Sequence, residues 1–142
     1  MIRAMRIEDY DEVFALWQRI DGFVIREIED SREGIAAFLQ RNPATSVVAQ
    51  EEGRIVGSIL CGHDGRRGCL YHVCVERRYR KQGVGSAMVS FSIKALEKEG
   101  VKRVHLIAFT RNELGNSFWQ GIGWTRRNDL YYYDYEIEKT CE

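Results

Sequence analysis

The sequence predicts a single domain of the mixed α/β (α+β) class, in which helices and strands share one core. Its 142 residues suit one domain spanning positions 1–142, and 44% of them are hydrophobic, enough to fill such a core. Short β-branched runs alternate with longer segments whose apolar residues recur at helical spacing. Tight glycine-containing turns join three of the β-branched runs, which indicates an antiparallel meander in the middle of the chain.

The first part of the chain predicts a strand, two helices and the three meander strands. The first helix is indicated by one apolar stripe, formed by Val13, Leu16, Trp17 and Ile20. The second helix begins at a capping signal, either Ser31 or Asp30 with Glu33, and ends near Pro43. The segment between these helices has no clean period and predicts a loop or irregular helix. The expected boundaries are 2–5, 46–50, 55–62 and 70–75 for strands, 9–20 and 31–40 for helices, and 21–30 for the loop.

The second part predicts a long central helix, a core strand, a shorter helix and two closing strands. The central helix carries apolar residues on more than one face and stops at Gly100. Thr110 and Glu113 resemble a capping box for the shorter helix, which extends through Gly121. The expected boundaries are 83–99 for the central helix and 102–109, 124–126 and 131–137 for strands.

Charge and hydropathy exclude several classes of protein. Lys+Arg and Asp+Glu both number 21, so the net charge is zero, whereas a nucleic-acid binder usually shows a basic excess or stripe. No apolar run approaches the roughly 18 residues of a membrane span. The N-terminal residues lack the apolar core of a signal peptide. We therefore expect a soluble cytoplasmic protein with no nucleic-acid and no membrane partner.

The four cysteines, Cys61, Cys69, Cys74 and Cys141, have no C-x-x-C spacing. Together with His63 and His72 they could suggest zinc, but both segments read as strands, where alternate residues face opposite sides. These side chains cannot all converge on one ion, so we expect no metal. Buried, reduced thiols are the favoured interpretation.

The most informative segment joins the third meander strand to the central helix. An apolar run that ends at Val75 breaks into a basic cluster, and Gly83 and Gly85 follow where the helix begins. The first N–H groups of a helix have no partners of their own, and the helix dipole favours negative charge there. The segment predicts a phosphate cradle, with basic side chains around it at Arg77, Arg78, Arg80 and Lys81. An ordinary glycine turn with solvated arginines is the alternative.

The spacing of the glycines excludes two common phosphate-binding motifs. A P-loop needs a lysine followed by serine or threonine after the second glycine, and none is present. The dinucleotide fingerprint needs a third glycine where Met88 stands. A nucleotide-binding domain is therefore disfavoured, and what remains is the pattern Arg80-x-x-Gly83-x-Gly85 between a strand and a helix.

This pattern resembles the acyl-coenzyme A pyrophosphate loop of the GNAT N-acetyltransferase superfamily. About thirty residues further on, Asn112 precedes a short helix with the aromatic pair Phe118 and Trp119, which ends in Gly123-Trp124 and resembles the family's second signature. The resemblance covers nearly the whole chain and is closest to small bacterial members of unassigned substrate. It implies the GNAT fold, a mixed, mainly antiparallel sheet with helices on both faces and a splayed central pair of parallel strands that holds coenzyme A.

The resemblance implies acetyl-CoA as co-substrate. Backbone N–H groups of residues 81–86 would hold the pyrophosphate, and the main chain of Val73 and Val75 would pair with the pantetheine arm. The amide of Val73 would also polarise the thioester carbonyl, and Asn112 would contact pantetheine, with helix capping as its alternative role. The implied cofactor-binding residues are Val73, Val75, Arg80, Lys81, Gln82, Gly83, Val84, Gly85, Ser86, Asn112 and Trp119.

The acid and the base of the reaction are less well defined. Many relatives place a tyrosine near the sulfur where this chain has Trp119, whose indole cannot act as a general acid near neutral pH; packing in the core is its alternative role. His72 is a candidate base because histidine titrates in the useful range, and Glu27 is a second candidate in the loop 21–30. Glu29 and Asp64 are further acceptors of the proton. A structural histidine and solvated carboxylates are the alternatives.

The expected function is transfer of acetyl from acetyl-CoA to a primary amine by direct attack in a ternary complex. The acceptor is a small molecule, an amino acid, or a peptide or protein amine. It is expected between the loop 23–30 and the strand 131–135, where acidic and aromatic groups suit a cation, while Arg66 and Arg67 would suit a carboxylate. A non-catalytic coenzyme A-binding module is the alternative function, and the resemblance is compatible with a homodimer.

Overall fold

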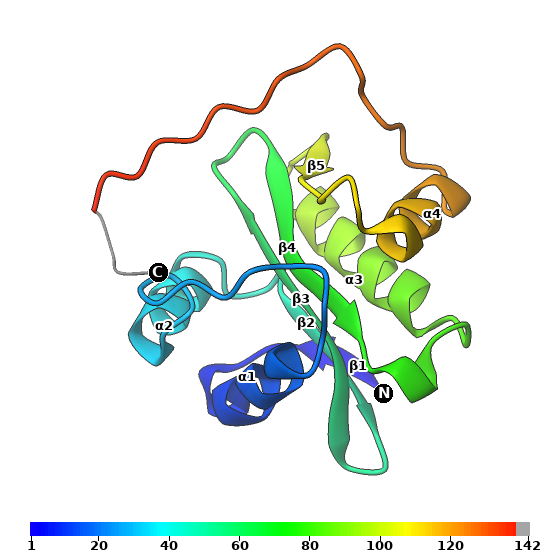
Figure 1. Ribbon diagram of the computed structural model, residues 1–142. Coiled ribbons are helices and arrows are strands. Elements are labelled where there is room, and N and C mark those ends of the chain that lie inside the picture. The colour runs from blue at the N-terminus through cyan, green and yellow to red at the C-terminus, as the bar shows by residue number, and fades with distance from the viewer. Residues whose placement is uncertain (139–142) are drawn as a thin grey trace.

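The computed structural model describes residues 1–138, which form a five-stranded sheet with helices on both faces (Figure 1). The strands are β1 (Ile2–Ala4), β2 (Val47–Glu51), β3 (Arg54–His63), β4 (Gly68–Val75) and β5 (Val104–Leu106). The helices are α1 (Tyr10–Gln18), α2 (Arg32–Arg41), α3 (Val84–Lys98) and α4 (Glu113–Gly121), with 3-10 turns η1 (Ile7–Asp9) and η2 (Arg77–Tyr79). The predicted α/β class is confirmed.

The strands lie in chain order across the sheet, β1-β2-β3-β4-β5. All neighbouring pairs are antiparallel except β4 and β5, which run parallel and pair only between residues 68–70 and 104–106. Beyond Leu70 the two strands part, so within the described residues the remaining edge of β4 has no strand partner on that side. This is the splayed parallel pair that the resemblance implied.

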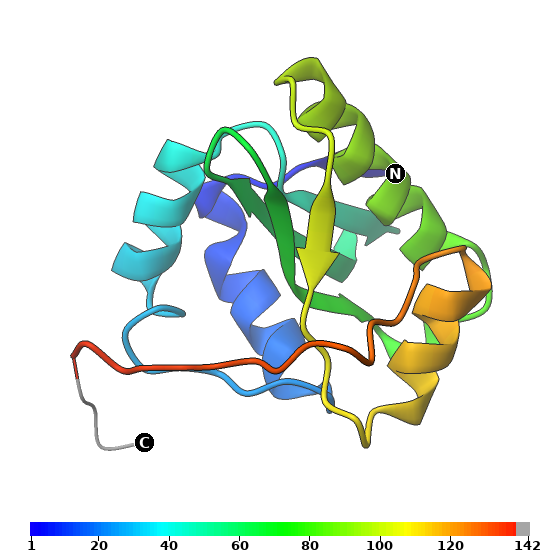
Figure 2. The ribbon, with the colours of Figure 1, turned by 90° about the horizontal axis from the view of Figure 1, so that it is seen from above.

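Two apolar clusters hold the helices on the sheet, one on each face (Figure 2). Helices α1 and α2 cover one face through the side chains Val13, Leu16, Trp17, Ile35 and Leu39. Helices α3 and α4 cover the other face, where α3 buries Met88, Val89 and Leu96. The indole N–H of Trp17, which is 1% exposed, donates to the hydroxyl oxygen of Ser58 at 2.9 Å. The buried indole therefore has its hydrogen-bond partner inside the core.

The two closing strands predicted at 124–126 and 131–137 are wrong. Residues 122–138 form no strand, and Figures 1 and 2 show this segment leading from α4 to the side of the sheet that carries α2. Its apolar side chains point into solvent, with Tyr131 88% and Ile137 94% exposed. The alternation of tyrosines indicates which side chains would share a face if this segment were a strand. A strand also needs a neighbouring strand to pair with, and the short β5 does not pair with this segment. Consequently β5 is the edge of the described sheet.

The buried thiols lie on opposite faces of the sheet. Cys61 belongs to the cluster under α3 and Cys74 to the cluster under α1. Burial raises the pKa of both thiols to about 11. In the part of the chain that the structure describes, no group of three or more His, Cys, Asp or Glu side chains is arranged to hold a metal ion. Cys141 lies outside the described residues.

Among residues 1–138, no helix has both the length and the apolar character needed to span a bilayer.

A bidentate ion pair ties β1 to the start of α1. The guanidinium of Arg3 donates to both carboxylate oxygens of Asp9, at 2.8 and 2.9 Å, and the backbone N–H of Arg6 donates to the same carboxylate at 2.9 Å. Burial alone raises the pKa of the Asp9 carboxyl, but the hydrogen bonds from Arg3 and Arg6 outweigh it, so the pKa lies below its usual value.

We expect Asp9→Asn to lower the free energy of unfolding by about 2–4 kcal/mol at pH 7, because it leaves Arg3 without its buried counter-charge. The folded pKa lies below the unfolded value of about 4, so this stabilisation is present above pH 4 and is lost as the pH falls through the folded pKa. Urea unfolding at pH 7 and pH 3 measures it: the gap between wild type and variant should narrow on acidification.

The control is Asp11→Asn, which removes an exposed ion pair with Arg32. It should change the free energy of unfolding by less than about 0.5 kcal/mol at either pH. A gap for Asp9→Asn that stays constant between pH 7 and pH 3 would contradict the assignment.

Candidate functional site

A β-bulge in β4 shapes the centre of the site. Between the pairs Ser58–Cys74 and Leu60–Tyr71, β3 contributes one residue and β4 contributes two, His72 and Val73. His72 adopts the left-handed conformation with φ +49°, which absorbs the extra residue. The bulge reverses the alternation, so that Val73 and Val75 both lie against the cluster under α3, whereas His72 turns toward α1.

The N-terminus of α3 lies directly after this strand and is left open. Two left-handed residues, Lys81 with φ +62° and Gly83 with φ +84°, turn the chain into the helix. No side chain caps α3, whereas Ser31 caps α2 and Asn112 caps α4 through hydrogen bonds of 3.0 and 3.1 Å. A Cβ placed on Gly83 would meet no atom within 4 Å. The first N–H groups of α3 therefore remain available to an external anion.

The basic loop is fixed to the strand end. The Arg80 guanidinium donates through Nε to the carbonyl oxygen of Val75 at 2.9 Å, and the side-chain amide of Gln82 donates to the carbonyl oxygen of Arg78 at 3.1 Å. These bonds hold the loop in place, and they leave the charge of Arg80 beside the opening of α3. The residues fit a pyrophosphate group in charge and in backbone geometry.

Gly85 has a packing role that the sequence did not reveal. A Cβ at this position would come within 3.2 Å of the Phe118 ring on α4. The missing side chain therefore lets α4 lie against the start of α3. Trp119 packs beside it, with ring centroids 5.0 Å from Phe118 and 4.7 Å from Trp124. The core role of Trp119 is present in the structure, and its contact with the cofactor stays a prediction.

Asn112 takes the capping role that was its alternative. Its side-chain oxygen accepts from the backbone N–H of Gly115, and its amide nitrogen lies 3.0 Å from where a Cβ on Gly22 would be. Asn112 therefore links α4 to the loop 21–30. Its amide nitrogen has no hydrogen-bond partner among residues 1–138, so the predicted contact with pantetheine remains a prediction.

His72 forms a dyad with Asp30 on the face of the sheet that carries α1. Its Nε2 lies 2.9 Å from an oxygen of Asp30, whose other oxygen accepts the backbone N–H of Arg26 at 2.7 Å. The imidazole stacks on Phe23, with centroids 4.4 Å apart, and meets the edge of Trp17 at 4.8 Å. Asp30 is only 4% exposed, so its carboxylate holds the ring in one orientation.

The structure separates the candidate bases. His72 joins the site through Asp30, whereas Glu27 is exposed on its loop and makes no hydrogen bond or ion pair within residues 1–138. Asp64 accepts backbone N–H groups in the β3–β4 hairpin, which lower the pKa of its exposed carboxyl. Asp30 was not foreseen as a partner of His72, because 42 positions separate them and no local pattern connects them.

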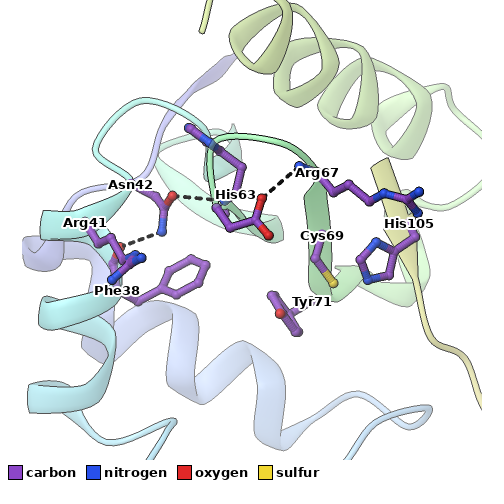
Figure 3. A pocket seen from close by; sticks show the side chains of 10 residues that line it. Phe38, Arg41, Asn42, His63, Arg67, Cys69, Tyr71 and His105 are labelled. Carbon is purple, nitrogen blue, oxygen red and sulfur yellow. Dashed lines mark hydrogen bonds between the residues drawn. The ribbon is translucent and has the colours of Figure 1, made fainter. Parts of the chain in front are cut away.

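An open pocket adjoins this part of β4. It has a volume of about 350 Å³ and lies between the end of α2, the β3–β4 hairpin and β5 (Figure 3). Tyr71 and Cys69 bring it to within a few residues of the bulge. It thus lies next to the position where the sequence predicts the thioester.

The comparisons agree with this arrangement of a splayed parallel pair beside an open helix N-terminus. Residues 8–124 match the model of the acetyltransferase (GNAT) family. Acetyltransferase SG1711 of Sodalis glossinidius is 31% identical over 129 residues, covering 91% of this chain and 89% of that protein. Acetyltransferase ECA0875 of Pectobacterium atrosepticum is 34% identical over 112 residues, covering 79% and 78%. The protein is an acyltransferase, and the chain belongs to the GNAT acetyltransferase family.

A solved structure shows the same fold at low sequence identity. AAC(6')-Iy, in complex with the bisubstrate analogue CoA-S-monomethyl-acetylneamine, superposes with a TM-score of 0.75 at 13% identity, over 96% of this chain and 98% of that one. The five-stranded sheet and its helices are thus similar to those of a protein that binds this bisubstrate analogue.

Proposed function

We propose that the protein transfers an acetyl group from acetyl-CoA to a primary amine, by direct attack while both are bound. The observation that carries the proposal is the uncapped N-terminus of α3, which lies beside the unpaired edge of β4. The names of the curated relatives and the bisubstrate analogue bound to AAC(6')-Iy support it.

The donor would be held by main chain more than by side chains. The N–H groups at the start of α3, reached through the left-handed Gly83, bind the pyrophosphate, and Arg80 and Lys81 supply positive charge. The edge of β4 beyond Leu70 pairs with the pantetheine arm as an additional strand would. The backbone N–H of Val73 donates to the thioester carbonyl oxygen, where negative charge develops.

The acceptor amine needs a base, because an alkylamine is mostly protonated near neutral pH. His72 serves as this base in our proposal. Asp30 accepts the proton on Nε2 and so leaves the lone pair on Nδ1, which has no partner within residues 1–138. His72 takes one proton from the ammonium group through Nδ1, which frees the nitrogen lone pair for attack on the thioester carbonyl. The second proton leaves the nitrogen of the tetrahedral adduct for solvent as the thiolate departs.

The sulfur leaves without a protein acid. Trp119 stands where many members of the family have a tyrosine, but its only polar group is an indole N–H, which is not an acid near neutral pH. Its ring is packed between Phe118 and Trp124. A thiol with an ordinary pKa near 8.5 is a good enough leaving group to depart as the thiolate.

Calorimetric titration of acetyl-CoA into the protein, followed by a thiol-release assay with a panel of amines, tests the proposal. We expect saturable binding and release of coenzyme A above background with at least one amine. Binding without release for any amine would favour the non-catalytic coenzyme A-binding module. Absence of binding would overturn the proposed function.

A further inference from the structure

The pocket beside β4 carries positive charge that the rest of the protein does not use. Its volume of about 350 Å³ lies in the range of small-molecule sites (Figure 3). The side chains that matter for its chemistry are Phe38, Arg41, Arg67, Cys69, Tyr71 and His105. They come from α2, the β3–β4 hairpin, β4 and β5, which the fold brings together around one opening.

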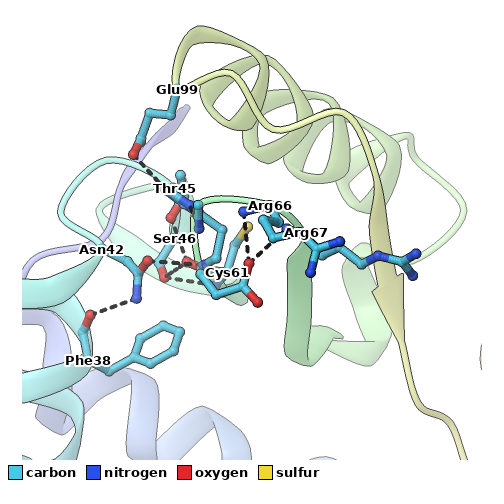
Figure 4. A network of polar contacts seen from close by, with 11 residues as sticks. Phe38, Asn42, Thr45, Ser46, Cys61, Arg66, Arg67 and Glu99 are labelled. Atoms are coloured by element: carbon cyan, nitrogen blue, oxygen red, sulfur yellow. Dashed lines mark hydrogen bonds and ion pairs between the residues drawn. The ribbon is translucent and has the colours of Figure 1, made fainter.

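One wall of the pocket is held rigid by a polar network (Figure 4). The Asn42 side chain accepts the backbone N–H of His63 at 3.1 Å and donates to the carbonyl oxygen of Phe38 at 3.3 Å. The His63 imidazole pairs with Glu99 at 2.7 Å. These polar groups are occupied by protein partners, so they form the wall and are not available to bind a ligand.

The hairpin tip is held in the same manner. One carboxylate oxygen of Asp64 accepts the backbone N–H groups of Arg66 and Arg67 at 2.8 and 2.9 Å (Figure 4). This fixes the main chain that carries the two arginines, while the negative charge of Asp64 offsets one of the pocket's positive charges. Of the two arginine side chains only that of Arg67 lines the pocket.

Three cationic or basic side chains of the pocket lack a protein partner. Within residues 1–138, the side chains of Arg41, Arg67 and His105 make no hydrogen bond or ion pair. A guanidinium group can donate a pair of parallel hydrogen bonds to a carboxylate or phosphate. The aromatic rings of Phe38 and Tyr71, 6.0 Å apart and nearly perpendicular, add an apolar surface suited to a methylene chain.

The other end of this surface is acidic. Burial raises the pKa of Tyr71, and the neighbouring Cys69 and the negative charge of Glu29 raise it further. At the bulge itself the negative charge is that of Asp30, whose carboxylate lies 2.9 Å from Nε2 of His72. An amine approaching the bulge would meet this charge, and an anion would meet the basic side chains of the pocket.

We propose that the acceptor is an ω-amino acid or ω-amino phosphate, whose amine lies at the bulge and whose anionic group lies at Arg67 and His105, on the side of the pocket away from Arg41 (Figure 3). This rests on the proposed acetyl transfer. The bulge takes up one residue of β4, since the five steps from Cys69 to Cys74 face only four steps of β3, from Gly62 to Ser58. At about 3.3 Å per step, Val73 lies about 10 Å from Cys69 along the sheet. The amine and the anion should therefore be separated by a chain of several methylene groups.

A series of amines of increasing length, assayed by coenzyme A release, tests the inference. The series is glycine, β-alanine, 4-aminobutyrate, 6-aminohexanoate and 8-aminooctanoate, and each acid is compared with its uncharged amide. We expect kcat/KM to rise with length to 6-aminohexanoate or 8-aminooctanoate. At that length the acid should exceed the amide by about tenfold or more. The corresponding ω-aminoalkyl phosphate shows which of the two anions is preferred.

Two variants and a matched control locate the anion site. Arg67→Gln and His105→Gln should each raise KM for the preferred acid by about tenfold, with kcat within about twofold. Arg66→Gln removes the same charge from the adjacent hairpin position, outside the pocket lining, and KM should stay within about twofold of wild type. Calorimetric binding of acetyl-CoA to each variant verifies that the donor site is intact.

Equal kcat/KM for acids and amides would overturn the inference, as would equal effects of Arg66→Gln and Arg67→Gln. Acetylation of other amines, with none of the ω-amino acids or phosphates accepted, would overturn it while the proposed function stands. If the wild type does not bind acetyl-CoA, both the inference and the proposed function are overturned.

Discussion

Gly83→Glu should reduce the affinity for acetyl-CoA by at least about a hundredfold. The substitution places a carboxylate in front of the unpaired N–H groups of α3, where it competes with the pyrophosphate and repels it. It also forces a side chain onto a residue with φ +84°, a conformation that only glycine adopts without strain. Isothermal titration calorimetry of acetyl-CoA with wild type and variant measures the change.

Gly100→Glu is the matched control. Gly100 follows the other end of α3, has φ +82°, and like Gly83 has no atom within 4 Å of an added Cβ. The two substitutions therefore impose the same backbone strain and the same charge about 25 Å apart, given a rise of about 1.5 Å per residue. Gly100→Glu should bind acetyl-CoA within about twofold of wild type. Equal losses in both variants would mean that strain, and not the cradle, is responsible.

His72→Asn should lower kcat by about 10²–10³-fold and leave the affinity for acetyl-CoA within about twofold. Asparagine tolerates the left-handed conformation at φ +49° and can still donate to Asp30, so it removes the basic nitrogen with little change of structure. Steady-state kinetics across pH 6–9 measures the effect. The rising limb of kcat/KM that the wild type owes to its base should be absent from the variant.

Asp30→Asn distinguishes the role of His72 as the base from the role of Asp30 in orienting it. Asparagine can still accept the Nε2–H of His72, but it no longer stabilises the charged imidazolium, so we expect a smaller loss in kcat of about tenfold. An unchanged kcat and pH profile in His72→Asn would show that the histidine is structural, held between Trp17 and Phe23.

The donor half of the site could be predicted because its signals are local in the sequence. A β-branched run, a basic cluster and two glycines fall within about fifteen positions, and each has its own structural meaning: the strand, the turn and the open helix start. The meander and α3 were predicted for the same reason. Their apolar periods and turn residues need no information from distant parts of the chain.

The acceptor half depends on contacts between distant segments. The dyad joins Asp30 to His72, and the pocket brings Arg41, Arg67 and His105 together from three elements. Nothing in the local sequence around any one of these residues indicates its partner. The same limit explains the wrong closing strands, because the alternation of Tyr131, Tyr133 and Tyr135 describes a face but contains no information on a neighbouring edge.

Burial makes the thiols of Cys61 and Cys74 nearly unreactive toward disulfide reagents in the folded protein. With a pKa of about 11, each thiol is present as thiolate on the order of one part in a thousand at pH 8, and neither is accessible to a bulky reagent. An aromatic disulfide can therefore report free coenzyme A while these two residues contribute little to the signal. In denaturant the same two residues become reactive, so their rate of labelling measures how fast the core opens on each side of the sheet.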